Sequence, residues 1–311
     1  MSSIITNVSA MTALRSLSAT NMSLEKTQAR VSTGLRVASA EDNAGYWSIA
    51  TTMRSDKSAL STVKDALGLG AATIDVAYTA TNSAIEVAKE IKNKLVAARQ
   101  PGVDRTKFQA EIAELQNQLS SIGDSAVFSG QNWLSVDSSA AGYNATKSIV
   151  ASFTRSNGAV SIGTISINTA NVKLYDTSAT AVGIVDGLRD ATGAISGTGT
   201  FSVATLSISA LTDSTADVTI LEGYIKGADA AISEMTSSAA TLGSAKTRVT
   251  LQKDFVSALS DALERGIGSL VDADMTEEST KLQALQVQQQ LAVQALSIAN
   301  QSAQSILTLF R

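Results

Sequence analysis

A single proline, Pro101, occurs in 311 residues, and this scarcity restricts the possible folds more than any other feature of the sequence. Average usage would place roughly 15 prolines in a chain of this length. Because proline ends or kinks helices, its near absence leaves room for very long ones. Alanine, leucine, glutamine and serine are abundant, and only 4% of the residues are aromatic. We therefore predict long helices that pair through thin seams of small side chains.

The spacing of apolar residues supports coiled-coil pairing of these helices. Alternating steps of four and three residues select one series near the start, namely Ala10, Leu14, Leu17, Asn21, Leu24, Gln28, Val31 and Leu35. After Gly45 the same spacing selects a longer series, namely Leu60, Val63, Leu67, Gly70, Ile74, Ala77, Thr81, Ala84, Ala88, Ile91, Leu95 and Ala98. The second series predicts one helix of about 50 residues. It should end at Gln100, because Pro101 removes a donor.

Two further helices complete a predicted three-helix rod. Asp104 is expected to cap a third helix, which the short connection makes antiparallel to the second. Its apolar positions are Phe108, Ile112, Leu115, Leu119 and Ile122. Apolar residues at heptad spacing resume from Ile232 to Leu270 and form one stripe of a further helix. Leu251, Phe255 and Leu259 form a second, adjacent stripe on the same helix. Two apolar stripes on one helix predict two helical neighbours.

The segment between Gly130 and Thr219 has a different composition, rich in serine, threonine, glycine and alanine. Apolar residues alternate with polar ones at 165–167 and 206–209, which predicts short strands. Asn157-Gly158 has the composition of a type I′ hairpin turn. We therefore expect a small β-rich insert in the middle of the chain.

Both ends of the chain are nearly free of charge. Residues 282–310 contain no charged side chain, and residues 1–24 carry only Arg15. In the C-terminal stretch, one heptad series consists of Leu285, Ala292, Leu296, Ala299, Ala303, Ile306 and Phe310, and a second face consists of Val287, Leu291, Ile298 and Leu309. Glutamine and asparagine fill the remainder, so the stretch is too polar for a bilayer centre. The two ends should pair with each other and retain apolar surface for repeated self-association.

The candidate site residues follow from this pattern. We expect self-association through the apolar positions of both ends, namely Leu14, Leu17, Leu24, Val31, Leu285, Leu291, Leu296, Ile298, Ile306 and Phe310. A polar set near the junction between the first helix and the rod consists of Arg30, Arg36, Glu41, Asp42, Asn43 and Arg54. We interpret its arginines as partners of Glu25, Glu41 and Asp42. The alternative is that they bond to carboxylates of a neighbouring copy.

The composition excludes several classes of chemistry. The chain has no cysteine and no histidine, so zinc sites of the usual kind, Ser-His-Asp triads and cysteine nucleophiles cannot be built. A net charge of −4 provides no positive field for nucleic acid. Neither a cleavable signal peptide nor a membrane span is predicted. The densest acidic groups, at 41–42, 254–264 and 272–274, are interpreted as helix caps and solvated loops and not as metal ligands. We therefore expect no metal. We also expect no cofactor and no enzymatic activity.

These observations define one architecture. We predict a mainly α chain, with a long antiparallel coiled-coil rod built from both termini and a small β-rich insert in the middle. Terminal helices occupy residues 1–34 and 275–311. The rod, with a β-hairpin, occupies residues 45–145 and 220–271, and a variable surface segment occupies residues 146–219.

Three segments resemble the bacterial flagellins and occur in the same order. Ser-Thr-Gly-Leu-Arg-Val at 32–37, followed by Ser-Ala-Glu-Asp-Asn-Ala-Gly at 39–45, is similar to the family's junction after its first helix. Ser-Gly-Gln-Asn-Trp-Leu at 129–134 resembles its turn into β-hairpins, and residues 297–311 resemble its terminal helix. The resemblance covers both ends and leaves the central segment unmatched.

The resemblance implies a subunit that polymerises into the helical flagellar filament, the propeller of bacterial swimming. It implies terminal helices that fold on assembly into an inner tube, with the β-rich insert facing solvent. Implied partners are further copies, other flagellins in the same filament, the flagellar export apparatus, an export chaperone, and hook-junction and cap proteins. The implied location is extracellular, reached without a cleavable signal peptide. The alternatives are a hook–filament junction protein and a secreted adhesin carried on a coiled coil.

Overall fold

The computed structural model describes residues 7–156, 158–178, 182–196 and 199–309, with side chains in the last helix described as far as residue 301. The described residues form the long helices α1 (Val8–Thr33), α2 (Ala44–Ala97), α3 (Arg105–Ser125), α4 (Thr215–Val271) and α5 (Met275–Leu309). The mainly α fold predicted from the sequence is confirmed. None of the described helices is both long and apolar enough to cross a membrane.

The chain divides into two compact units. The terminal unit comprises residues 1–58 and 260–311, and the central unit comprises residues 59–259. Helices α2 and α4 contribute to both, because each contains a boundary between the units.

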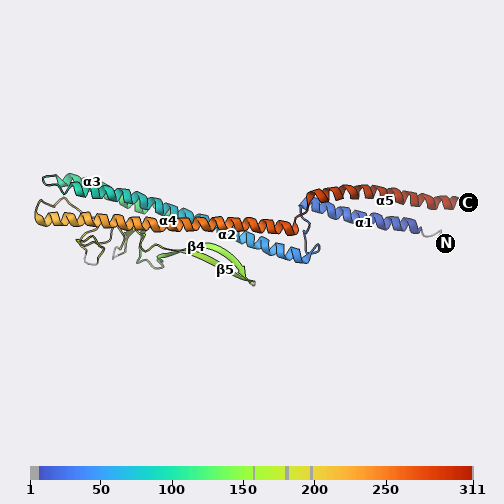
Figure 1. The fold of residues 1–311 in the computed structure, drawn as a ribbon, viewed down its shortest axis with the longest axis horizontal. Helices are drawn as coiled ribbons and strands as arrows, with labels where there is room; N and C mark the ends of the chain where they lie inside the picture. Colours follow the sequence, from blue (N-terminus) through green and yellow to red (C-terminus); the bar gives the residue numbers. More distant parts are fainter. Residues whose placement is uncertain (1–6, 157, 179–181, 197–198, 310–311) are drawn as a thin grey trace. The chain divides into compact units, whose positions relative to one another are not determined.

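In the terminal unit, α1 and α5 lie side by side (Figure 1). The segments that join them to α2 and α4 are tied together by backbone hydrogen bonds. The amides of Arg36 and Val37 donate to the Val271 carbonyl, and the Ala273 amide donates to the Gly34 carbonyl. A small core lies beneath these bonds and consists of Val37, Ala50, Ile267 and Val271. The base of the α1–α5 pair is therefore fixed within its unit.

In the central unit, α2 and α4 run antiparallel in a constant register. Polar pairs join Lys64 to Ser257, Asp75 to Lys246, Lys92 to Asp229 and Arg99 to Glu222. As the residue number rises along α2, the number of its partner falls by the same amount. Every position of the longer predicted heptad series, from Leu60 to Ala98, is buried. The predicted seam of this helix is confirmed.

The connection between α2 and α3 forms as predicted. Helix α2 ends at Ala97, shortly before the expected end at Gln100, and Gly102 adopts a left-handed conformation with φ of 80°. The Asp104 side chain then caps α3 by accepting a hydrogen bond from the Thr106 amide at 3.1 Å. Lys94 of α2 lies 2.6 Å from Glu111 of α3.

Strand structure is less extensive than predicted. The antiparallel hairpin β4 (Thr146–Ser156) and β5 (Ala159–Asn168) includes the predicted strand at 165–167. Gly158 has φ of 81° in the turn, and Asn157 lies outside the described residues. The other strands are two residues long: β1 (Val127–Phe128) pairs with β2 (Gln131–Asn132), and β3 (Ser135–Val136) pairs with β6 (Tyr175–Asp176).

The prediction of a strand at 206–209 is wrong. Leu206 and Ile208 are buried, but their backbone is bonded to side chains of α3 instead of a neighbouring strand. Gln116 donates to the Leu206 carbonyl, and the Ile208 amide donates to Gln109 Oε1 at 2.8 Å. An extended loop lying on a helix produces the same alternation of buried and exposed residues as a strand.

The prediction of two helical neighbours for the second stripe of α4 is also wrong. Leu251 and Phe255 are 65% and 59% exposed. In this part of α4 the neighbour is the β4–β5 hairpin and not a second helix. Gln252 of α4 donates to the Ala151 carbonyl at 3.0 Å, and Arg248 donates to the Ser166 carbonyl at 3.3 Å.

Candidate functional site

The α1–α5 pair, here called the terminal pair, meets along one narrow seam. Three polar contacts set an antiparallel register: Asn7 Nδ2 donates to the Ala299 carbonyl, Gln289 Nε2 donates to Asn21 Oδ1, and Arg30 pairs with Glu278. The α1 side of the seam consists of the buried or half-buried residues Ala10, Ala13, Leu17, Thr20, Leu24, Thr27 and Val31. The α5 side consists of Glu278, Leu282, Leu285, Gln289, Ala292, Leu296 and Ala299.

The predicted seam of α1 was therefore wrong at alternate positions. Leu14, Asn21 and Gln28 are exposed, and the seam contains Ala13, Thr20 and Thr27 in their place. The heptad spacing holds, but the first step from Ala10 is three residues instead of four. The α1 seam thus alternates small residues with the larger Leu17, Leu24 and Val31. At the first misassigned position hydrophobicity favours Leu14 over Ala13, and the four-three spacing counted from Leu14 then selects Asn21 and Gln28.

The predicted self-association residues fall into two groups in the structure. Half-buried seam residues are Leu17, Leu24, Val31, Leu285 and Leu296. Exposed residues are Leu14, Leu291 and Ile298, at 57%, 58% and 66%. Phe310 and the side chain of Ile306 lie outside the described residues. The structure thus separates contacts within the pair from surface that the pair leaves uncovered.

Both helices carry further exposed apolar side chains that the sequence prediction missed as site residues. On α1 these are Val8, Met11 and Met22, and on α5 they are Val287 and Val293. Together with Leu14, Leu291 and Ile298 they form what we call the outer faces of the terminal pair. Met11 and Met22 lie outside both the predicted and the observed seam of α1, so the heptad spacing gave no signal for them. Several exposed large apolar side chains on one pair of helices are typical of a protein–protein contact.

A shallow groove between α1 and α5 has a volume of about 530 Å³. Its lining is almost entirely small, consisting of Val8, Ser9, Thr12, Ala13, Ser16, Ala292, Ala295 and Ala299. Such a groove accepts large side chains from another helix, because knobs of one helix fit holes of the next.

The junction arginines have partners other than those predicted. Arg30 Nη1 lies 2.9 Å from Glu278 Oε1, and Arg36 Nη2 donates to the Leu270 carbonyl at 3.0 Å. Arg30 is in the last turn of α1 and Glu278 in the first turn of α5, where the helix dipoles favour these charges. The sequence signal for this pair was that Glu278 is the last acidic residue before the uncharged stretch. An antiparallel partner brings it to the end of α1.

The remaining junction residues shape the connection from α1 to α2. Asp42 lies 2.9 Å from Lys26, and the Ala38 and Ser39 amides also donate to its carboxylate. These bonds, led by that from Lys26, lower the pKa of Asp42 from its ordinary value. Asn43 Oδ1 accepts a hydrogen bond from the Tyr46 amide at 3.0 Å. The other two predicted residues, Glu41 and Arg54, are exposed.

Comparison with known proteins identifies the family. The bacterial flagellin N-terminal helical region matches residues 4–139, and the bacterial flagellin C-terminal helical region matches residues 225–310. Flagellin C of Rhizobium meliloti (strain 1021) is 49% identical over 323 residues, and Flagellin A of the same strain is 45% identical over 398 residues. A flagellin of Brucella melitensis biotype 1 is 45% identical over 312 residues. Each alignment covers 100% of both chains. The chain therefore belongs to the bacterial flagellins, the structural subunits of the flagellar filament.

Proposed function

We propose that this filament subunit polymerises through its terminal pair, and that the outer faces of α1 and α5 become buried between copies to form the inner tube of the filament. One observation carries the proposal: the seam between α1 and α5 covers a single side of each helix and leaves Leu14, Leu291 and Ile298 more than half exposed. Uncharged helices with a second apolar face gain stability in water when another surface covers that face.

The predicted site residues take two roles in this proposal. The seam residues, such as Leu17 and Leu296, hold α1 against α5 within one copy. The outer residues, such as Leu291 and Ile298, contact further copies. Arg30, Arg36 and Asp42 of the junction set fix the base of the pair. Its exposed members could reach a neighbouring copy, Glu41 pairing with a cation and Arg54 with a carboxylate.

Electron microscopy after controlled polymerisation tests the proposal. The full chain is expected to form long filaments, and a variant lacking residues 282–311 is expected to form none. A double variant, Leu291→Gln with Ile298→Gln, should also fail to polymerise, because it removes outer apolar surface while keeping helix-forming, uncharged residues. A matched variant, Gln288→Ala with Gln294→Ala, changes exposed polar positions of the same helix and should still form filaments.

Two outcomes would overturn this account. Filaments from the truncated chain would show that the terminal pair is not the assembly surface. Short capped seeds from the full chain would favour a junction subunit over a filament subunit. Circular dichroism of each variant should retain the helical signal of the central unit, which separates failure to assemble from failure to fold.

We further propose that the subunit reaches the extracellular filament through the flagellar export apparatus without losing a signal peptide. An export chaperone would cover the outer faces before assembly, and hook-junction and cap proteins would bound the filament at its two ends. Other flagellins in the same filament would pack through the same faces. Intact mass of filament protein checks the export route, because a mass lacking an N-terminal segment would contradict it.

A further inference from the structure

Methionine is the only sulfur-containing residue type of this chain, which has six methionines and no cysteine. With no thiol present, its thioethers are the sulfur groups that an oxidant can attack. Exposure differs widely among the methionines that the structure describes. Met22, Met11 and Met275 are 65%, 48% and 44% exposed, Met53 is half-buried, and Met235 is fully buried. An oxidant therefore reaches the two methionines of α1 and the first residue of α5 ahead of the others.

The two methionines of α1 lie on one side of the helix, opposite its seam with α5. The step from Met11 to Met22 is about three helical turns, so the two side chains lie on the same side. The seam residues Thr20 and Ala13 are each about two and a half turns from one of them, since Thr20 follows Met11 and Ala13 precedes Met22 by that distance. Both thioethers are therefore turned away from α5, and only a surface other than α5 can cover them.

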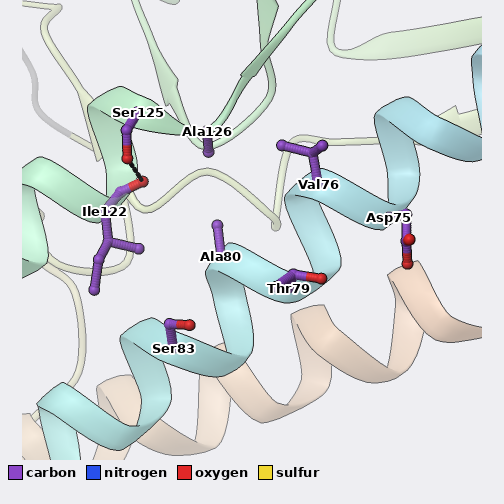
Figure 2. A pocket seen from close by; sticks show the side chains of 8 residues that line it. All are labelled: Asp75, Val76, Thr79, Ala80, Ser83, Ile122, Ser125 and Ala126. Atoms are coloured by element: carbon purple, nitrogen blue, oxygen red, sulfur yellow. Dashed lines mark hydrogen bonds between the residues drawn. The ribbon is translucent and has the colours of Figure 1, made fainter.

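The central unit offers no comparable target among its described residues. Its one methionine, Met235, is fully buried in α4. A groove of this unit, between α2 and the end of α3, has a volume of about 380 Å³ and includes Val76, Ala80 and Ile122 in its lining. Figure 2 shows its lining side chains, none of which contains sulfur. Mild oxidation should therefore alter the terminal unit and leave the fold of the central unit unchanged.

Oxidation removes the apolar character of a methionine side chain. In the reaction with hydrogen peroxide, the sulfur lone pair forms an S–O bond, the O–O bond breaks, and water leaves. Sulfur loses two electrons, and the peroxide gains them. The product, methionine sulfoxide, is polar, whereas methionine is flexible and apolar. The exposed Val8 and Leu14 flank Met11, so its new oxygen would lose water without gaining a donor from these neighbours when the face is buried.

We propose that Met11 and Met22 are oxidation sites that control assembly, at which a peroxide converts free subunits into a form that does not polymerise. The inference rests on the proposed function, because the sulfoxides act by preventing the outer face of α1 from packing against another copy. Assembled filaments are protected, since the contact that buries the two thioethers also excludes the oxidant. The modification is reversible, because methionine sulfoxide reductases, supplied with a dithiol, remove the oxygen as water.

Polymerisation of oxidised subunits tests the proposal. Free full-length subunits are treated with hydrogen peroxide and separated from it before polymerisation. Peptide mass spectrometry locates each added oxygen atom, and electron microscopy and turbidity measure the filament yield. We expect a several-fold loss of filaments that parallels oxidation of Met11 and Met22, and recovery after treatment with both reductases and a dithiol. Circular dichroism should show that the oxidised subunit retains the helical signal of the central unit.

Two variants assign the loss to particular methionines. Met11→Leu with Met22→Leu removes both thioethers of α1, and Met275→Leu removes the exposed thioether of α5. Each variant is compared with its own untreated sample, so the result does not depend on how well it assembles without peroxide. Peroxide should reduce the filament yield of Met275→Leu several-fold and that of the double variant little. An equal loss in both variants would overturn the assignment to Met11 and Met22.

A measurement on the unmodified chain decides the question if the double variant forms no filaments. Met11 and Met22 should be oxidised several-fold more slowly in filaments than in free subunits, and equal rates would refute the inference. Normal filaments from subunits in which both sulfoxides are confirmed by mass would also overturn it and leave the role of the terminal pair intact. Filaments from the chain lacking residues 282–311 would contradict the proposed function instead.

Discussion

At the scale of single residues, Arg189 attaches the loop-rich part of the central unit to α4. Its side chain is fully buried. Nη1 donates to the Gly193 carbonyl and Nη2 to the Ile184 carbonyl, each at 2.7 Å, and both nitrogens donate to the carboxylate of Glu234. One guanidinium thus fixes two loop carbonyls and one helix. A buried charge held this way is costly to expose or to leave without its partners.

Replacing this side chain should release the loops. Arg189→Ala leaves two buried carbonyls without donors and opens a cavity, so the free energy of unfolding of the central unit should fall by about 3–5 kcal/mol. Urea denaturation followed by circular dichroism measures the loss. Arg248→Ala is the control, because Arg248 is exposed and makes one backbone hydrogen bond, and it should cost less than about 1 kcal/mol. Equal losses in the two variants would contradict the assigned role.

The seam of the terminal pair shows which residue-level features the sequence discloses. The amide contact between Gln289 and Asn21, at 2.8 Å, lies at the edge of the seam, because Asn21 is exposed. The partner of Arg30 was not foreseen, because Glu25, Glu41 and Asp42 are closer in sequence than Glu278. Proximity along the chain is a poor guide where two helices far apart in sequence run antiparallel.

At the scale of elements, the seam of a helix could be predicted where its large apolar residues all serve one surface. Every position predicted for the seam of α2 is buried, and polar pairs hold residues 64–99 against α4 in one register. The seam of α1 was only half predicted. Its large apolar residues serve a second surface, so the sequence contains two overlapping patterns, and only the structure assigns Ala13 and Leu14 to different faces.

The loop-rich part of the chain was the least predictable element. Leu206 and Ile208 alternate with serine as in a strand. They are buried, however, in a loop whose backbone is hydrogen-bonded to Gln116 and Gln109 of α3. The bulge at Ala151 was equally hidden, since a single extra residue reverses the faces of β4 without changing its composition. Local periodicity reports which residues are buried and does not report what buries them.

Two leucines of α1 separate the two uses of that helix. Leu17 lies on the seam and Leu14 on an outer face. Leu17→Ala should weaken the terminal pair of the free subunit by about 1–2 kcal/mol, because a half-buried side chain is lost. Leu14→Ala should leave the pair intact and raise the protein concentration needed for polymerisation. Hydrogen exchange of α5 in the free subunit and turbidity during polymerisation measure the two effects. Identical effects of both substitutions on exchange would show that the faces are not distinct.

At the scale of the whole molecule, the two units differ in how much they bury. In α1 the only buried residue is Thr27. In the central unit, α2, α3 and α4 contribute fully buried side chains such as Leu67, Ile112 and Met235. Stability is distributed accordingly, because local opening is easiest where few apolar contacts are buried. Helices α1 and α5 thus combine exposed large apolar side chains with few fully buried ones.

This difference predicts two-step melting of the free subunit. Heating should first release α1 and α5, with a loss of helical signal but no exposure of the buried Trp133, and then unfold the central unit. In filaments the first step should move to higher temperature, because contacts with other copies stabilise only the folded terminal pair. Circular dichroism and the fluorescence of Trp133 follow the two steps, recorded on free subunits and filaments of a Trp47→Phe variant because Trp47 lies in the terminal unit. The variant lacking residues 282–311 supplies the control, since it should show only the second step. A single transition of the free subunit, seen equally by both signals, would mean that the terminal pair is as stable as the central unit and needs no neighbour to hold it.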